Sequence, residues 1–227
     1  MSELSKILSE LKSLANPEVV KGMARFGINP ENCLGITIPT LRALAKKTGK
    51  NHKLALELYK VDLHEGKTLA CYIDDYKEVT EKQMEDWVLG FNSWDVCDQT
   101  CSNLFDKTPF AYQKALDWSK RDEEFVKRAG FVLMAVMAVH DKKMDNSRFD
   151  NFFEAIVREA NDNRNFVKKA VNWALRQIGK RNKTLNKKAV ELSLKIESQN
   201  TKSAKWIAKN AYKELIDPKI VSRLKDP

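Results

Sequence analysis

The chain has 227 residues, of which 43% are hydrophobic and 31% charged, a composition that excludes an intrinsically disordered protein. Its 40 Lys and Arg residues outnumber 31 Asp and Glu residues, which gives a net charge of +9. Only 8 Gly and 6 Pro interrupt long stretches of good helix formers. We therefore expect an all-α fold in one domain, residues 1–227.

No apolar signal segment follows Met1, and the longest apolar run, residues 129–139, is too short to span a bilayer. We therefore expect a cytoplasmic protein with no membrane partner. The four cysteines, at positions 33, 71, 97 and 101, form no CxxC pair, and the three histidines are scattered. This pattern predicts buried free thiols, no metal site and no cofactor.

The predicted helices follow one another with short breaks. They cover residues 2–15, 17–26, 39–49, 52–60, 65–74, 80–91, 92–105, 109–120, 123–139, 147–160, 165–180, 186–198 and 202–215. Asn92 or Ser93 is expected to cap the helix that runs through Phe105, and Thr108 to cap the next one, which begins at Pro109. The helix 123–139 is apolar on every side beyond Arg128, so we expect it to be buried at the centre.

One short segment occurs twice. Phe125-Val-Lys-Arg-Ala129 recurs 41 residues later as Phe166-Val-Lys-Lys-Ala170, each time near the start of a long helix. A period near 40 residues with two helices per unit is typical of a HEAT-like array, an α-solenoid with a concave surface. Equivalent positions would then place Arg128 and Lys169 on one face. A generic helical bundle is the alternative.

Positive charge is concentrated in the second half of the chain. Residues 121–227 hold 24 Lys and Arg against 14 Asp and Glu, whereas residues 1–120 hold 16 against 17. Residues 163–190 contain nine basic residues and no acidic one. This asymmetry indicates a surface that faces a polyanion, with a generally solvated basic surface as the alternative.

The helix 165–180 carries an aromatic residue among cations. Its apolar stripe consists of Val167, Val171, Ala174, Leu175 and Ile178. Trp173 lies on the opposite side, which it shares with Lys169, Arg176 and Lys180. On a nucleic-acid surface such cations bind phosphates while the ring packs on a base or sugar. Alternatively, a neighbouring helix covers the ring.

A second aromatic residue has a carboxylate beside it. Trp94 and Asp98 are spaced i, i+4 on a predicted helix, so both side chains point the same way and can reach a cleft. The structural alternative is that Trp94 packs while Asp98 favours the helix N-terminus or pairs with a lysine. Arg128 lies at another helix N-terminus, where a cation opposes the helix dipole, so an anion is expected nearby: Asp98, another acid or a phosphate.

These segments together resemble a known family. Asn92-Ser-Trp-Asp-Val-Cys-Asp98, the two repeated segments, the continuation Val171-Asn-Trp-Ala-Leu-Arg176, and Gly35-Ile-Thr-Ile-Pro39 followed by Arg42 are similar to the AlkD-type DNA alkylation repair proteins. The resemblance spans nearly the whole chain in order. It implies a HEAT-like superhelix with a concave basic groove that binds duplex DNA and excises N3- or N7-alkylated purines.

The resemblance also implies roles for individual residues. Trp94 and Trp173 would flank the deoxyribose of the lesion, Asp98 would be the catalytic carboxylate, and Arg128 would hold the DNA backbone. The chain departs from the family at Ser93, where the well-known glycosylases carry a second Trp, so we expect different packing at the site. Lys169, Arg176 and Lys180 are the candidate phosphate contacts.

The residue types suit the chemistry that the resemblance implies. A cationic alkylated purine is a good leaving group, so the carboxylate of Asp98 need only stabilise an oxocarbenium-like sugar and orient water. The sequence thus favours a monomeric DNA glycosylase that contacts the DNA backbone with weak sequence specificity and strong salt dependence. The alternatives are a non-catalytic protein that binds damaged or branched DNA, and a protein–protein scaffold.

Overall fold

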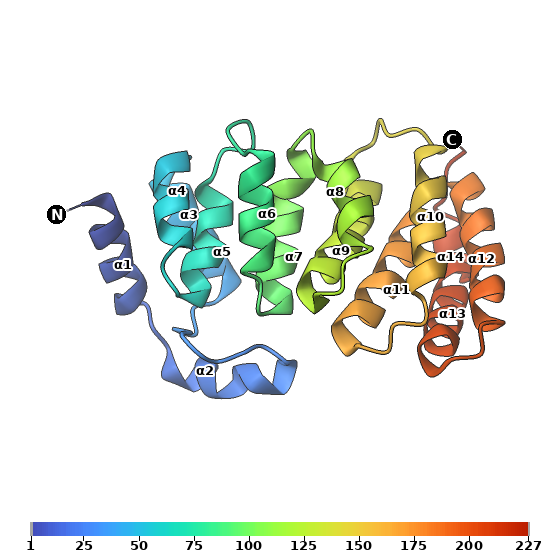
Figure 1. Ribbon diagram of the computed structural model, residues 1–227, viewed down its shortest axis with the longest axis horizontal. Helices are drawn as coiled ribbons and strands as arrows, with labels where there is room; N and C mark the ends of the chain where they lie inside the picture. Colours follow the sequence, from blue (N-terminus) through green and yellow to red (C-terminus); the bar gives the residue numbers. More distant parts are fainter. Residues whose placement is uncertain (1, 227) are drawn as a thin grey trace. The chain divides into compact units, whose positions relative to one another are not determined.

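The structure is a computed structural model that describes residues 2–226. The regular elements of these residues are all helices, so the all-α prediction is confirmed for them (Figure 1). They divide into two compact units, one ending at Pro109 and the other beginning at Phe110. That the two units form a single domain, residues 1–227, stays a prediction.

The helices of the first unit have at most 11 residues each. They are α1 (Glu3–Ser13), α2 (Pro17–Met23), the 3-10 helix η1 (Ala24–Phe26), α3 (Ile38–Thr48), α4 (His52–Tyr59), α5 (His64–Ile73), α6 (Glu81–Leu89), α7 (Trp94–Asn103) and the 3-10 helix η2 (Phe105–Lys107). Helix α5 packs against α3, α4 and α7, while α1 packs against α4 and α5. Helix α2 runs crosswise to the other helices of this unit (Figure 1).

The loop before α3 is held tightly against α5. The buried carboxylate of Glu65 accepts the backbone N–H groups of Leu34, Gly35 and Ile36, at 2.8, 2.7 and 3.2 Å. Gly35 has a left-handed φ of 74°, and a Cβ there would lie 2.3 Å from the carbonyl oxygen of Asn16. A side chain at this position would therefore displace α2 from α3.

The second unit is built from two layers of helices. It contains α8 (Ala111–Trp118), α9 (Glu124–His140), α10 (Arg148–Glu159), α11 (Asn165–Gly179), α12 (Lys183–Glu197), α13 (Lys202–Leu215) and α14 (Pro218–Val221). Helix α9 packs against α11 and α11 against α13, which forms one layer. Helices α8, α10 and α12 form the other layer in the same order.

The repeated segments occupy equivalent places in adjacent helices of one layer. The rings of Phe125 on α9 and Phe166 on α11 lie 5.4 Å apart between centroids. Every residue of α9 from Val126 to Ala138 is buried, as the apolar sequence predicted. At Gly130 a Cβ would lie 2.6 Å from the backbone nitrogen of Ser119, so only glycine allows α9 to approach the end of α8 this closely.

Two predicted helix starts are wrong. Thr108 does not cap α8, because its hydroxyl donates to the carbonyl of Phe105 at 2.8 Å and closes η2 instead. Helix α12 begins at Lys183 rather than at residue 186, because the side chain of Asn182 accepts the N–H of Leu185 at 2.9 Å and caps the helix there.

The cap at α7 also differs in detail. Ser93 occupies the N-cap position of this helix, but its side chain makes no capping bond to the helix backbone. The four-residue helix α14, capped by Asp217, is too short for apolar periodicity to predict.

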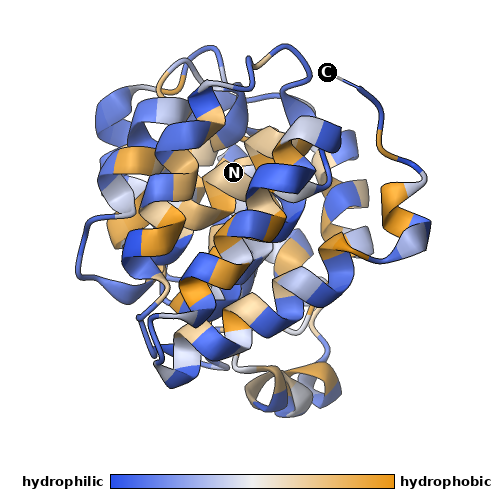
Figure 2. Cartoon of the chain, turned by 90° about the vertical axis from the view of Figure 1, so that its right-hand side faces the viewer, coloured by the Kyte–Doolittle hydropathy of each residue, from blue (hydrophilic) through white to orange (hydrophobic). Residues whose placement is uncertain are grey.

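In Figure 2 the longer helices carry hydrophobic residues on one side and hydrophilic residues on the other, as expected of helices that pack one face into a core.

Candidate functional site

The first turns of α7 carry two of the predicted site residues. Because the helix begins at Trp94, Trp94 and Asp98 lie one turn apart on the same face, and both side chains are partly exposed. The indole Nε1 of Trp94 donates to the main-chain carbonyl of Phe26 at 2.9 Å, and this bond fixes the orientation of the ring. Trp94 and Asp98 therefore lie together on one partly exposed face of α7.

Asp95, the residue after Trp94, belongs to a charged pair. Its carboxylate accepts a hydrogen bond from the buried hydroxyl of Ser93 and lies 2.9 Å from Nε2 of His64. Burial lowers the pKa of His64, but the hydrogen bonds with Asp95 and Cys33 outweigh it and raise the pKa to about 10. Burial likewise raises the pKa of Asp95, yet the bond to His64 leaves it below its usual value. Both groups are therefore ionised at neutral pH.

The pairing of His64 with Asp95 shows what a serine at position 93, in place of the tryptophan of the well-known glycosylases, does locally. The serine hydroxyl binds Asp95, and a larger aromatic side chain could not make that bond. Since Asp95 adjoins Trp94, the network of Ser93, Asp95 and His64 anchors the start of the helix that presents Trp94 and Asp98.

A cavity of about 420 Å³ lies beside this network within the first unit. Its walls come from α2, η1, the loop before α3, and the helices α3, α5 and α7. The apolar lining includes Val19, Met23, Phe26, Ile36 and Leu41, and the polar lining includes His64 and Asp95. No sequence pattern indicates this cavity, because its walls come from segments that are far apart along the chain.

Arg128 lies near the N-terminal end of α9 and is only 6% exposed. Its guanidinium donates to the main-chain carbonyl of Phe166 on α11 at 2.7 Å. This carbonyl is not the anion expected beside Arg128, and the identity of that anion stays a prediction. The bond between Arg128 and Phe166 holds the N-terminal ends of α9 and α11 together.

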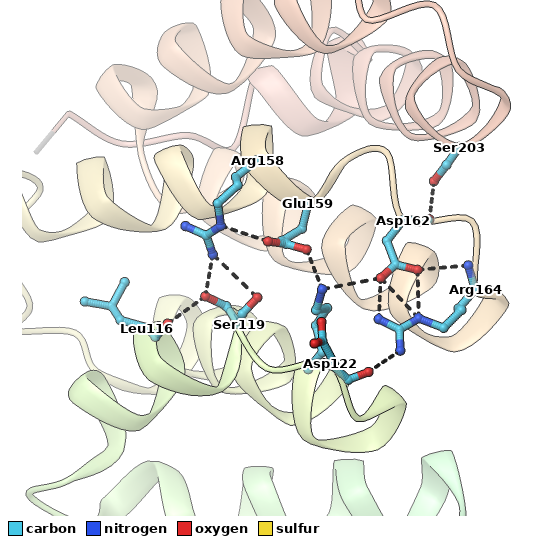
Figure 3. Close-up of polar contacts among 9 residues, drawn as sticks. Leu116, Ser119, Asp122, Arg158, Glu159, Asp162, Arg164 and Ser203 are labelled. Atoms are coloured by element: carbon cyan, nitrogen blue, oxygen red, sulfur yellow. Dashed lines mark hydrogen bonds and ion pairs between the residues drawn. The ribbon is translucent and has the colours of Figure 1, made fainter.

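A network of charged side chains surrounds this end of the two helices (Figure 3). Lys127, which is 7% exposed, lies 2.6 Å from the carboxylate of Glu159 and 3.6 Å from that of Asp162. Arg158 binds Glu159, and Arg164 binds Asp162, so the two acids are each shared between cations. The network ties the starts of α9 and α11 to the end of α10, and so fixes the helices that carry Arg128 and Trp173.

The exposed side of α11 carries the remaining predicted residues. Trp173 is partly exposed and Lys169 is exposed, whereas the five residues of the apolar stripe are buried. Arg176 and Lys180, however, both contact the carboxylate of Glu214 on α13. Burial raises the pKa of Glu214, but its bonds to Lys180 and Arg176 outweigh this and lower it. An acid from another helix thus neutralises part of the face that is acid-free in sequence.

A second cationic surface in the same unit lies at the ends of α9 and α11. A cleft of about 740 Å³ there is lined by five cations, Lys142, Lys143, Lys180, Arg181 and Lys225, and by two acids, Asp145 and Asp226. The guanidinium of Arg181 donates to the carbonyls of Ala138 and Met144, both at 3.0 Å. Apart from Lys180, the sequence analysis did not single out these residues, although the adjacent lysines 142 and 143 are a local signal of positive charge.

The structure therefore places the predicted residues in two groups. Trp94 and Asp98 share a face of α7 in the first unit. Arg128 and Trp173, with its neighbouring cations, lie on the packed helices α9 and α11 of the second unit. The shared face of Trp94 and Asp98 is the one predicted from their spacing, and the approach of the two groups to one another stays a prediction.

The cysteines are free thiols. Cys71, Cys97 and Cys101 are buried as predicted, and Cys33 is partly exposed. Burial raises the pKa of the Cys71 thiol to about 12. Residues 2–226 contain no group of three or more His, Cys, Asp or Glu placed to hold a metal ion. None of the helices in this part of the chain has the length and apolar character needed to cross a membrane.

Two solved structures show how similar this chain is to known proteins. One is described as "A new family of proteins related to the HEAT-like repeat DNA glycosylases with affinity for branched DNA structures". It matches with a TM-score of 0.75 at 22% identity, over 85% of this chain and 82% of that one. An engineered protein matches with a TM-score of 0.45 at 13% identity, over 95% and 97% of the two chains. No curated protein sequence matches.

The first of these structures confirms the predicted fold class, an all-α HEAT-like helical repeat. A family model described as "DNA alkylation repair enzyme" matches residues 7–215, which is most of the chain and includes both groups of predicted residues. The chain therefore belongs to the DNA alkylation repair enzyme family.

Proposed function

We propose that this protein is a DNA glycosylase that hydrolyses the N-glycosidic bond of N3- and N7-alkylated purines in duplex DNA. Membership of the repair-enzyme family, over residues 7–215, supports the substrate class. The observation that carries the catalytic part is the placement of Trp94 and Asp98 on the first turns of α7, where both are partly exposed on one face.

The reaction needs few groups. Alkylation at N3 or N7 makes the purine cationic, so the C1′–N bond breaks with its electron pair moving to the base, which leaves neutral. The sugar develops oxocarbenium character, which the carboxylate of Asp98 stabilises by its charge. Water then attacks C1′, and the proton it loses passes by way of Asp98 to solvent. The indole of Trp94 adds cation–π attraction to the same charge, worth roughly 0.5–2 kcal/mol.

In this proposal most of the residues that bind DNA lie in the second unit. Trp173 packs on the lesion sugar from α11, while Arg128, Lys169, Arg176 and Lys180 hold backbone phosphates. These contacts neutralise phosphates without reading bases, so binding has weak sequence specificity and falls steeply with salt.

Release of alkylated bases tests the proposal directly. Purified protein is incubated with duplex DNA that contains N7-methylguanine or N3-methyladenine, and free base is quantified against time. Asp98→Asn should lower the release rate by roughly 100-fold or more, the usual effect of removing one transition-state charge contact. DNA affinity should change little, because binding rests on cations elsewhere.

The matched control is Asp86→Asn, which makes the same change in charge on an exposed carboxylate of α6 in the same unit. This variant should release base at the wild-type rate. If the wild-type protein binds duplex DNA but frees no alkylated base, the glycosylase assignment is wrong.

A second candidate function is supported by the solved structure with affinity for branched DNA. On this alternative the protein binds branched or damaged DNA without catalysis, and the same cations hold its phosphates. Competition between a four-way junction and a linear duplex of equal length separates the two functions. A strong preference for the junction, together with no base release, favours this alternative.

A further inference from the structure

The most exposed large hydrophobic side chain of the described residues lies beside Trp94. Phe26, at the end of η1, is 73% exposed, whereas the next most exposed, Leu89, is 58% exposed. An isolated exposed apolar residue is common on protein surfaces. Phe26 differs because its own carbonyl accepts the indole N–H of Trp94, at 2.9 Å.

The backbone that carries this ring is fixed. The N–H of Gly27 donates to the carbonyl of Ala24 at 3.0 Å, and that of Ile28 donates to the carbonyl of Met23 at 3.3 Å. Gly27 has a left-handed φ of 72°, which ends η1 and turns the chain away after Phe26. An aromatic ring that faces solvent from a fixed backbone can bind a partner at little entropic cost.

The residue before Phe26 in the chain is a cation. Arg25 is exposed, and among the described residues its guanidinium makes no ion pair, whereas Lys21 on α2 is paired with Glu18 at 2.7 Å. One side of Phe26 also lines the cavity of about 420 Å³, so the ring stands at its mouth. A free cation next to an exposed ring is the combination that proteins use on nucleic acid, with the cation on phosphate and the ring between or against bases.

We propose that Arg25 and Phe26 form a wedge that enters duplex DNA beside Trp94, with the ring unstacking a base step and the guanidinium binding the adjacent phosphate. The partner is DNA because the chain belongs to a DNA repair family and the ring lies beside Trp94, which the proposed function places against DNA. The inference rests on the proposed function only in taking DNA as the partner, and it does not require base release.

Binding measurements on four variants test the wedge. Affinity for a duplex is measured at several salt concentrations with Phe26→Ala and Arg25→Gln. The controls are Leu89→Ala, an exposed apolar residue on α6, and Lys12→Gln, an exposed cation on α1. Phe26→Ala should weaken binding roughly 5- to 150-fold, as removal of a base-stacking aromatic does, without changing the salt dependence. Arg25→Gln should reduce the slope of log K against log salt by about 0.9, the value for one phosphate.

A second readout follows base stacking. A duplex with 2-aminopurine at the bound step should become more fluorescent with the wild-type protein, because the wedge unstacks that base, and should respond less to Phe26→Ala. Phe26 is largely exposed, so its truncation should leave the unfolding temperature unchanged. The variant therefore reports on binding and not on folding.

The outcomes separate the wedge from the proposed function. If the wild-type protein binds duplex DNA and Phe26→Ala behaves like Leu89→Ala in both measurements, the wedge is wrong while DNA binding stands. If the wild-type protein does not bind duplex DNA at all, both are wrong. If the wild-type protein binds duplex DNA and Phe26→Ala weakens that binding, but the wild type releases no alkylated base, the wedge stands and only the glycosylase assignment is wrong.

Discussion

Glu214 should compete with the phosphates of DNA for Arg176 and Lys180. Its carboxylate on α13 contacts both Arg176 and Lys180, two of the residues proposed to bind the DNA backbone. The Glu214 side chain is 25% exposed, so solvent screens this pairing only in part. Glu214→Gln keeps the shape of the side chain and removes its charge, which frees the two cations for phosphate.

The size of the effect follows from the number of cations released. Each additional phosphate contact steepens the slope of log K against log salt by about 0.9, so two contacts steepen it by up to about 1.8. Between 50 and 200 mM salt, this steeper slope should cost Glu214→Gln about tenfold more affinity than the wild type loses. At low salt the variant should bind DNA more tightly than the wild type. The loss of the ion pairs should cost roughly 1 kcal/mol of stability, because these pairs are partly solvated.

Fluorescence anisotropy with a labelled duplex measures both quantities. The matched control is Glu197→Gln, which makes the same change in net charge on an exposed glutamate at the other end of the helix hairpin formed by α12 and α13. A general effect of net charge would appear equally in both variants. If Glu214→Gln and Glu197→Gln show the same affinity and the same salt slope, Arg176 and Lys180 do not bind the DNA backbone.

Two further predictions concern stability. The pKa of His64 is raised from 6.5 to about 10, so its pairing with Asp95 stabilises the fold fully below pH 6.5 and loses that contribution between pH 6.5 and about 10. In urea unfolding across this range, the wild type should therefore lose more stability than the double variant His64→Gln, Asp95→Asn; equal losses would contradict the pairing. Lys127→Met should cost roughly 1.5–3 kcal/mol, because it removes the charged hydrogen bond of a nearly buried lysine to Glu159, while Arg158 still pairs with that acid. The equivalent Lys168→Met loses only the contact with the Trp206 ring at 5.0 Å, about 1 kcal/mol; similar thermal unfolding of the two variants would refute this difference.

The sequence alone determined the parts of the protein that depend on neighbours within a helix. Apolar periodicity predicted nearly every helix, and the uninterrupted apolar run predicted that α9 is buried. The repeat of Phe125 at Phe166 predicted that the two helices that carry them are equivalent, and the two rings are in contact. The shared face of Trp94 and Asp98 followed from the i, i+4 spacing, because helix geometry fixes which residues point the same way.

The charge of the α11 face could not be predicted in this way. Residues 163–190 contain no acid, yet Glu214, 34 residues beyond Lys180, neutralises two cations of this face. Only the packing of α13 against α11 brings that carboxylate there. A count of charges along the chain therefore overestimated the positive charge of the proposed DNA surface.

The surroundings of Trp94 were likewise decided by tertiary structure. His64 lies 31 residues from its partner Asp95, and Phe26 lies 68 residues from Trp94. Neither pair has a local signal, because hydrogen bonds between distant segments depend on how helices and loops pack and not on sequence spacing. The sequence thus determined which residues each helix presents, and the tertiary structure decided the charged and apolar neighbours that those residues meet.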